Sequence, residues 1–384
     1  MKSIGIKLIL TLGFLGAVAV LGQTPAPAPP QQGPGVQAPA DARYSDWIAT
    51  KCKVPPAGRG GGGGAARGAA PGPGGGAAAA RGAGGGAARG NPNEPPPKRD
   101  YSVTEIPGVI AAGQKWKSIW TGTGNNADGI IGTKDGGILA AQNTNSAVMK
   151  IDKDAKVSFP YMDTNTGGAV SMNKKGALFI VERGLPTAVW QLAPSRRLVA
   201  NMLNGEPLDC IGGVINDLTA ASNGGVYFTM GGLFYVNPQG VAARQGTIAG
   251  TNGIILSPDE KKLYVTGRIG AAPAGGAGGG GGSLIAYDVK PDGTLTNERQ
   301  FAMVGGDGST VDAAGRIYST GGGGVQVVGP DGKFLGEIPS PLPLITVAFS
   351  GKDKQTLYGV ANTQRFDEIF TIEMIAKGYK GRAK

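Results

Sequence analysis

The fold is decided by a unit best seen in Asn252-Gly-Ile-Ile-Leu-Ser-Pro-Asp-Glu-Lys-Lys-Leu-Tyr-Val265 and Asp307-Gly-Ser-Thr-Val-Asp-Ala-Ala-Gly-Arg-Ile-Tyr318. Both copies begin with Asn or Asp followed by Gly, continue as a short apolar strand, turn through polar residues, and end in a second strand. Runs of this kind, bounded by turn residues, are typical of strands rather than helices. Six copies are recognisable, and they begin at Asp128, Gly168, Asn216, Asn252, Asp307 and Thr346.

The spacing of these copies predicts a β-propeller. Successive starts are 40, 48, 36, 55 and 39 residues apart, and four-stranded propeller blades repeat about every 40–50 residues. We therefore expect an all-β, six-bladed β-propeller over residues 101–384. A two-sheet sandwich would have a similar strand content, but it would not explain why equivalent dipeptides recur once in each unit. The segment Tyr101–Trp120, which precedes the first copy, is predicted to supply the outer strand that closes the last blade.

The chain before residue 101 has a different character. Residues 1–22 are predicted to be a signal peptide, because Lys2 and Lys7 precede an apolar run, Leu8–Leu21, that ends in small residues. An uncleaved membrane anchor is the alternative, although the run is shorter than the ~20 residues that a spanning helix needs. We expect a secreted or periplasmic protein with no stable membrane insertion after cleavage of the signal.

Residues 23–100 are predicted to be a disordered arm and linker, because Gly, Ala and Pro dominate them. A short ordered island is expected around residues 43–53. The Gly-rich stretch Gly270–Gly282 is expected to be a surface loop.

The distribution of charge argues against a nucleic-acid partner. The formal net charge is +10, but residues 101–376 carry 22 basic and 23 acidic side chains, so the basic charge lies in the flanks. A nucleic-acid-binding domain would place its basic stripe on the fold itself.

The absence of histidine from the sequence restricts the chemistry. It excludes a Ser-His-Asp triad, a Cys-His dyad and any histidine-ligated zinc or iron site. Two cysteines are too few for a structural zinc site. A metal would therefore be held by oxygen atoms, which favours Ca²⁺, Mg²⁺ or Mn²⁺.

Four polar residues stand just before the first strand of their units: Asp128, Asn216, Asn252 and Asp307. The innermost strands of a propeller line its central channel, so residues at the same end of these strands converge. Each residue alone is better explained by an ordinary turn. Together, two carboxylates and two amide oxygens predict a site for a hard cation at one mouth of the channel.

The blocks resemble those of the SMP-30/gluconolactonase/LRE family. Asn252–Val265 is similar to the family's NGLAFSPDEKTLYV, Asp307–Tyr318 to DGLAVDADGNLWV, and Asn216–Thr229 to NDLVVDSKGGVYFTD. Val347–Gly351 with Thr356–Tyr358 fits VAFGG…TLY. The resemblance covers residues from about 120 to 375. It implies a six-bladed propeller with one divalent cation in the channel, Ca²⁺ in the first place and Mg²⁺ or Mn²⁺ as alternatives.

The resemblance also implies roles for individual residues. Asn252 and Asp307 match the family's metal ligands, and Asn216 matches an asparagine that contacts substrate. Asp128 occupies the place of the family's first ligand, a glutamate, and is one methylene shorter. Glu182-Arg183 stands where many bacterial members have Glu-His, and is expected either to line the pocket as substrate-binding residues or to form a salt bridge at its rim.

We therefore expect an exported, metal-dependent hydrolase of lactones or similar small esters. The cation would polarise the carbonyl group, and Asp307, as the catalytic residue, would take the proton from the attacking water. Its partner would be a small-molecule lactone or ester, and the protein a monomer. The alternative is a non-catalytic exported propeller that binds a glycan, a peptide or a partner protein, because fold alone does not decide function.

Cys52 and Cys210 are the only cysteines in the sequence. An exported protein usually oxidises such a pair, so we expect a Cys52–Cys210 disulfide that holds the 43–53 island across the propeller face. The alternative is a buried thiol at Cys210, with Cys52 free or paired between molecules.

Overall fold

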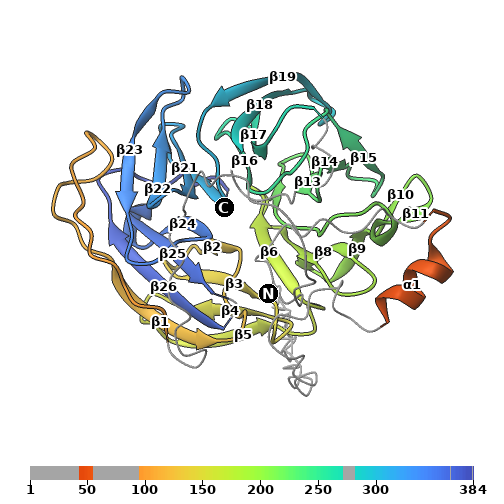
Figure 1. The fold of residues 1–384 in the computed structure, drawn as a ribbon, viewed down its shortest axis with the longest axis horizontal. Coiled ribbons are helices and arrows are strands. Elements are labelled where there is room, and N and C mark those ends of the chain that lie inside the picture. The colour runs from red at the N-terminus through yellow and green to blue at the C-terminus, as the bar shows by residue number, and fades with distance from the viewer. Residues whose placement is uncertain (1–42, 55–94, 271–281, 364, 383) are drawn as a thin grey trace, which may run out of the picture.

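A computed structural model describes residues 43–54, 95–270, 282–363, 365–382 and 384. The predicted signal peptide, most of the arm and most of the Gly270–Gly282 stretch lie outside these ranges. Six antiparallel four-stranded sheets surround a central axis (Figure 1). The prediction of an all-β, six-bladed propeller is confirmed.

We number the blades by their innermost strands, in chain order. Blades one to three consist of β2 (Ile130–Gly132), β3 (Ile138–Gln142), β4 (Ala147–Ile151) and β5 (Val157–Tyr161); β6 (Gly167–Met172), β7 (Leu178–Glu182), β8 (Ala188–Ala193) and β9 (Arg197–Ala200); and β12 (Leu218–Ala220), β13 (Val226–Thr229), β14 (Leu233–Val236) and β15 (Ala242–Gln245). Blades four and five consist of β16 (Ile254–Leu256), β17 (Lys262–Gly267), β18 (Ser283–Val289) and β19 (Leu295–Ala302); and β20 (Ser309–Val311), β21 (Ile317–Gly321), β22 (Gly324–Val328) and β23 (Phe334–Pro339).

Blade six is closed by a strand that precedes blade one in the sequence. It consists of β24 (Thr346–Ser350), β25 (Thr356–Asn362), β26 (Phe366–Glu373) and, outermost, β1 (Lys117–Thr123). β1 pairs antiparallel with β26, from Lys117 opposite Thr371 to Thr123 opposite Phe366. The predicted closing strand is confirmed, and it extends three residues beyond the expected segment. Two short 3₁₀ turns lie in connections between strands: η2 (Leu208–Cys210) precedes β12, and η3 (Lys352–Lys354) joins β24 to β25.

Apolar side chains fill the space between neighbouring blades. Between blades two and three, Phe179 and Val181 pack with Phe228 and Phe234, all of them almost fully buried. Burial of each such side chain stabilises the fold by about 1.5–3 kcal/mol. These interfaces fix the angle between blades and therefore the convergence of the inner strands.

The inner strands approach one another so closely at the channel mouth that glycine is required there. A Cβ atom on Gly129 would lie 2.6 Å from Ala169 Cα in the next blade, and one on Gly253 would lie 2.4 Å from Asp307 O. Gly therefore follows Asp128 and Asn252 because the adjacent blade leaves no room for a side chain, rather than because the chain turns.

The 43–53 island forms a helix, α1 (Tyr44–Lys51), joined to the propeller by a Cys52–Cys210 disulfide with the Cα atoms 5.3 Å apart. Lys53 Nζ also lies 2.9 Å from Glu206 Oε1, in the short hairpin of β10 (Met202–Leu203) and β11 (Glu206–Pro207). Figure 1 shows α1 at the outer edge of the molecule, beside β10 and β11. This is the cysteine pairing that the sequence favoured. The expected position of the helix across the propeller face is wrong, because Cys210 lies in η2, in the peripheral connection that follows blade two. No helix among the described residues is long and apolar enough to cross a membrane.

Candidate functional site

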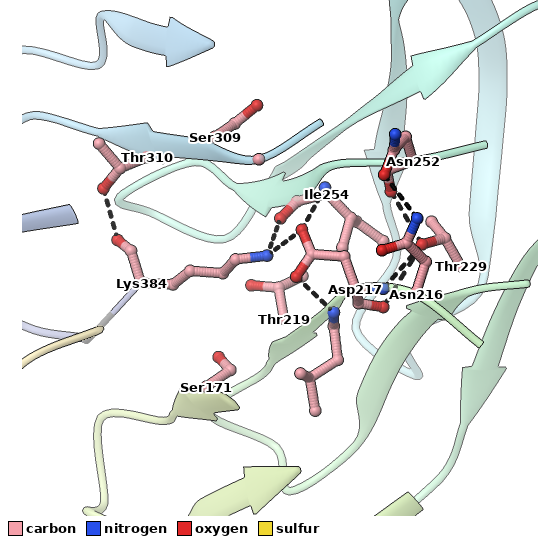
Figure 2. Close-up of polar contacts among 12 residues, drawn as sticks. Ser171, Asn216, Asp217, Thr219, Thr229, Asn252, Ile254, Ser309, Thr310 and Lys384 are labelled. Carbon is pink, nitrogen blue, oxygen red and sulfur yellow. Dashed lines mark hydrogen bonds and ion pairs between the residues drawn. The ribbon is translucent and has the colours of Figure 1, made fainter. Parts of the chain in front are cut away.

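The four predicted channel residues each stand two positions before an inner strand: Asp128 before β2, Asn216 before β12, Asn252 before β16 and Asp307 before β20. All inner strands begin at the same end of the propeller, so these residues share one channel mouth. The Asn216 Nδ2 amide donates a hydrogen bond of 2.6 Å to Asn252 Oδ1 (Figure 2). The Asn252 side chain in turn hydrogen-bonds Asp307. Residues of blades three, four and five are thus in contact.

Arg183 connects this group to Asp128. It follows β7, and its Nη1 lies 2.5 Å from Asp128 Oδ2 while donating to Asn143 Oδ1 at 3.0 Å. Its Nη2 donates to Asn216 Oδ1 at 3.2 Å. The Arg183 side chain is 6% exposed and that of Asp128 is 18% exposed. A buried guanidinium therefore bridges blades one and three at the mouth, where it lines the site.

Glu182 is directed elsewhere. Its Oε1 lies 2.9 Å from Nη2 of Arg196, in the turn between β8 and β9, whose side chain is 37% exposed. Burial raises the pKa of the Glu182 carboxyl to about 7, although the charge of Arg196 lowers it. Of the two adjacent residues, Arg183 lines the site and Glu182 forms the salt bridge at the rim.

Negative charge is in excess at the mouth. Burial, together with the charges of Asp128 and Asp217, raises the pKa of Asp307 to about 7, although Arg183 and a hydrogen bond from Asn252 lower it. Three carboxylates, those of Asp128, Asp217 and Asp307, therefore face two cations, Arg183 and Lys384. A site with this surplus is suited to a further cation.

Asn143, Asp217 and Lys384 belong to the same polar group but were not predicted from the sequence. Asn143 Nδ2 donates to Asp128 Oδ2 at 2.8 Å, and Asp217 forms an ion pair with Lys384 (Figure 2). The position of Asn143, directly after the second strand of blade one, is a signal that could have identified it, because that end of the strand meets the mouth. Nothing in the local sequence around Lys384 indicates that it reaches the channel.

The donor atoms at the mouth are the oxygen atoms that a hard cation prefers. Within the described ranges, no three side chains of the types His, Cys, Asp and Glu gather as a metal-binding group. The predicted set of two carboxylates and one amide is thus sparse in acids, and Asp128 is already engaged by Arg183 and Asn143. Asp307 fits a divalent cation directly, whereas Asn252 and Asp128 fit one by sharing oxygen atoms that already accept hydrogen bonds from Asn216 and Arg183.

The protein is therefore a six-bladed propeller with a cluster of amide and carboxylate side chains at one channel mouth. The family model described as SMP-30/Gluconolactonase/LRE-like region matches residues 158–362, and the chain belongs to this family. The matched range contains Asn216, Asn252 and Asp307, whereas Asp128 precedes it.

Individual relatives agree with this assignment. The chain is 29% identical over 175 residues to a gluconolactonase from Zymomonas mobilis, a match that covers 37% of this chain and 46% of the relative. It spans about half the length of the curated relatives it matches. A gluconolactonase structure from Xanthomonas campestris matches with a TM-score of 0.58 and 21% identity, covering 75% of this chain and all of that one. The calcium-binding protein regucalcin from Agrobacterium tumefaciens matches with a TM-score of 0.50 and 15% identity, covering 68% of this chain and 96% of that one. At these identities, the two structures support the fold.

Proposed function

We propose that the protein is a lactonase-type hydrolase that acts on lactones or similar small esters at the channel mouth. The observation that carries the proposal is the position of the Asp307 carboxyl group at the channel mouth, beside an amide pair and a buried guanidinium. A carboxylate placed within reach of a water molecule can act as a general base. The gluconolactonase relative supports the choice of a lactone as the substrate class.

The residues at the mouth have separate tasks in this reaction. Asp307 would take a proton from a water molecule that attacks the substrate carbonyl carbon. Asn216 and Arg183 carry N–H groups at the same mouth, and they would donate hydrogen bonds to the oxygen atom that becomes negative. Donors fixed in this way stabilise the developing charge without having to reorganise. Ring opening then passes the proton to the leaving alkoxide oxygen, which gives the hydroxy acid.

The site would hold its divalent cation on Asn252 and Asp307, with Asp128 as a shared third ligand. Such a cation polarises a carbonyl group and offsets the charge of the tetrahedral oxyanion. We propose Ca²⁺ as the first candidate, because regucalcin binds calcium, and Mg²⁺ or Mn²⁺ as alternatives. The sharing of Asp128 predicts a weaker site than one whose three ligands are all free.

We also propose that the protein is exported. The Cys52–Cys210 disulfide supports this, because disulfides persist in oxidising compartments such as the periplasm and the extracellular space.

A panel of lactones and simple esters, assayed with and without EDTA, tests the function. Wild-type protein should hydrolyse at least one lactone, and Asp307→Asn should lower the rate by about 10²–10⁴-fold, the usual contribution of a general base. The matched control is Asp331→Asn, at a half-exposed carboxylate in the turn after β22, which should leave the rate unchanged. Absence of turnover across the panel would refute the hydrolase and favour a binding protein. Full activity in Asp307→Asn would remove this residue from the mechanism.

A further inference from the structure

The segment that follows β26 enters the channel from the end opposite the mouth. Lys377 O accepts a hydrogen bond of 2.8 Å from Ala313 N, just beyond the last residue of the inner strand β20. The Arg382 guanidinium, almost completely buried, donates to Leu256 O at 2.6 Å and to Thr219 Oγ1 at 3.0 Å. Leu256 is the last residue of its inner strand, so Arg382 lies toward the far end of the channel.

Lys384 reaches closer to the mouth. Its Nζ donates a hydrogen bond of 2.9 Å to Ile254 O, at the first residue of β16, and forms an ion pair with Asp217. Its backbone oxygen accepts a hydrogen bond of 2.7 Å from Thr310 Oγ1. The side chain is 3% exposed. Figure 2 shows that Lys384 lies beside Thr310 and that its side chain extends toward Asp217.

Asp217 is the residue through which Lys384 acts on the site. Asp217 Oδ2 accepts from Ile254 N at 3.0 Å, and Oδ1 accepts from Leu218 N at 2.8 Å. This carboxylate therefore ties the start of β12 to the start of β16. Asn216 is its neighbour in sequence, and Asn252 lies two residues before Ile254. These hydrogen bonds of Asp217 consequently help to set the distance between the side-chain amides of Asn216 and Asn252.

The ammonium group of Lys384 contacts both strands at this point, through the carboxylate of Asp217 and the carbonyl oxygen of Ile254. We propose that Lys384 is a positioning residue for the Asn216–Asn252 pair, and that Arg382 and Lys384 together close the channel beneath the site. The geometric part of the proposal stands by itself, whereas its effect on turnover rests on the function proposed above. A buried carboxylate that loses its cation must recruit water or move, so loss of Lys384 should loosen the start of both strands.

The first experiment compares Lys384→Met with Lys380→Met by hydrogen exchange and mass spectrometry. Methionine keeps the length of the side chain and removes the charge, and Lys380 is a 66% exposed lysine of the same segment. Exchange in peptides that contain residues 217–220 and 254–256 should be accelerated about tenfold in Lys384→Met, because local opening governs exchange. Peptides of 138–142 should not change, and Lys380→Met should match wild type throughout. Unchanged exchange at both sites, or an equal increase in all blades, would overturn the proposal.

The second experiment needs no variant, so it decides the matter even when Lys384→Met fails to fold. Native wild-type protein is reductively methylated with formaldehyde, and the modified lysines are located by peptide mapping. Lys380 should react readily, and Lys384, buried and ion-paired, should react at least about tenfold more slowly. Equal reaction at the two lysines would show that Lys384 does not lie buried in the channel, and would overturn the proposal.

The third experiment separates positioning from a general structural role. In the lactone assay, Lys384→Met should lower kcat by more than it raises KM, because Asn216 would donate to the oxygen atom that becomes negative in the transition state, and Lys384→Arg should restore part of the loss. A fall in thermal stability with kinetic constants unchanged would leave Lys384 purely structural and overturn its positioning role. If wild-type protein hydrolyses no lactone, the proposed function fails, while the exchange and labelling results still decide the placement of Lys384.

Discussion

Replacement of Arg183 by methionine removes the cation that bridges blades one and three, and its cost can be worked out from the contacts. The substitution leaves Asp128 without its 2.5 Å partner and leaves Asn143 Oδ1 and Ile215 O without a donor. Breaking a buried ion pair costs about 3–5 kcal/mol. Because Asp128 remains 18% exposed and is partly solvated, the lower end applies, so we expect a loss of about 3 kcal/mol.

Urea denaturation gives the free energy of unfolding for wild type, Arg183→Met, Asp128→Asn and the double variant. A loss of about 3 kcal/mol corresponds to a fall of about 6 °C in Tm, at about 2 °C per kcal/mol for a large domain. The double variant should lose about 1–3 kcal/mol less than the sum of the single variants, because the residues are in direct contact. Lys333→Met is the control, since it breaks an exposed, solvent-screened pair with Asp331 and should leave the free energy of unfolding nearly unchanged.

The same variants test the sharing of Asp128 with a cation. In Arg183→Met the carboxylate is released, so millimolar Ca²⁺ should raise the Tm of this variant more than that of wild type, by mass action. A loss below about 1 kcal/mol, or additive effects in the double variant, would refute the bridging role of Arg183.

Three further predictions concern other parts of the molecule. Gly253→Ala should destabilise the protein by about 1–3 kcal/mol in urea, because the new Cβ would meet Asp307 O at 2.4 Å; unaltered stability would show that the inner strands are further apart. Glu182, whose pKa burial raises to about 7 from its usual 4.5, contributes stability that is present below pH 4.5 and lost as the pH rises through 7. Wild type should therefore lose stability relative to Glu182→Gln between pH 5 and pH 8, and parallel unfolding curves for the two proteins would contradict this. Reduction of the Cys52–Cys210 disulfide should make residues 43–53 sensitive to trypsin while the propeller remains resistant, since the helix is held at the rim; cysteine peptides that alkylate freely without reductant would disprove the bridge.

The sequence alone was enough to predict the six blades, the closing strand and the four polar residues that share the channel mouth. The reason is that these features repeat: turn residues and short apolar strands recur every 36–55 residues, and equivalent positions in a rotational repeat occupy the same end of the channel. Asp128, Asn216, Asn252 and Asp307 could be placed together on this basis alone. The sequence also favoured the Cys52–Cys210 pairing, because the chain offers no other cysteines.

The side chains that connect these residues could be identified only from the three-dimensional structure. Arg183 reaches Asp128 across 55 residues of sequence, and Lys384 reaches Ile254 across 130. The repeat assigns positions to the backbone, but it does not specify the direction of a long side chain or the path of a segment outside the repeat. The same holds for α1, whose place at the rim follows from the position of η2 on the molecule. Contacts of this kind depend on the packing of the blades against one another. Burial and the neighbouring charges in the assembled channel determine the position of the charged end of an arginine or lysine side chain.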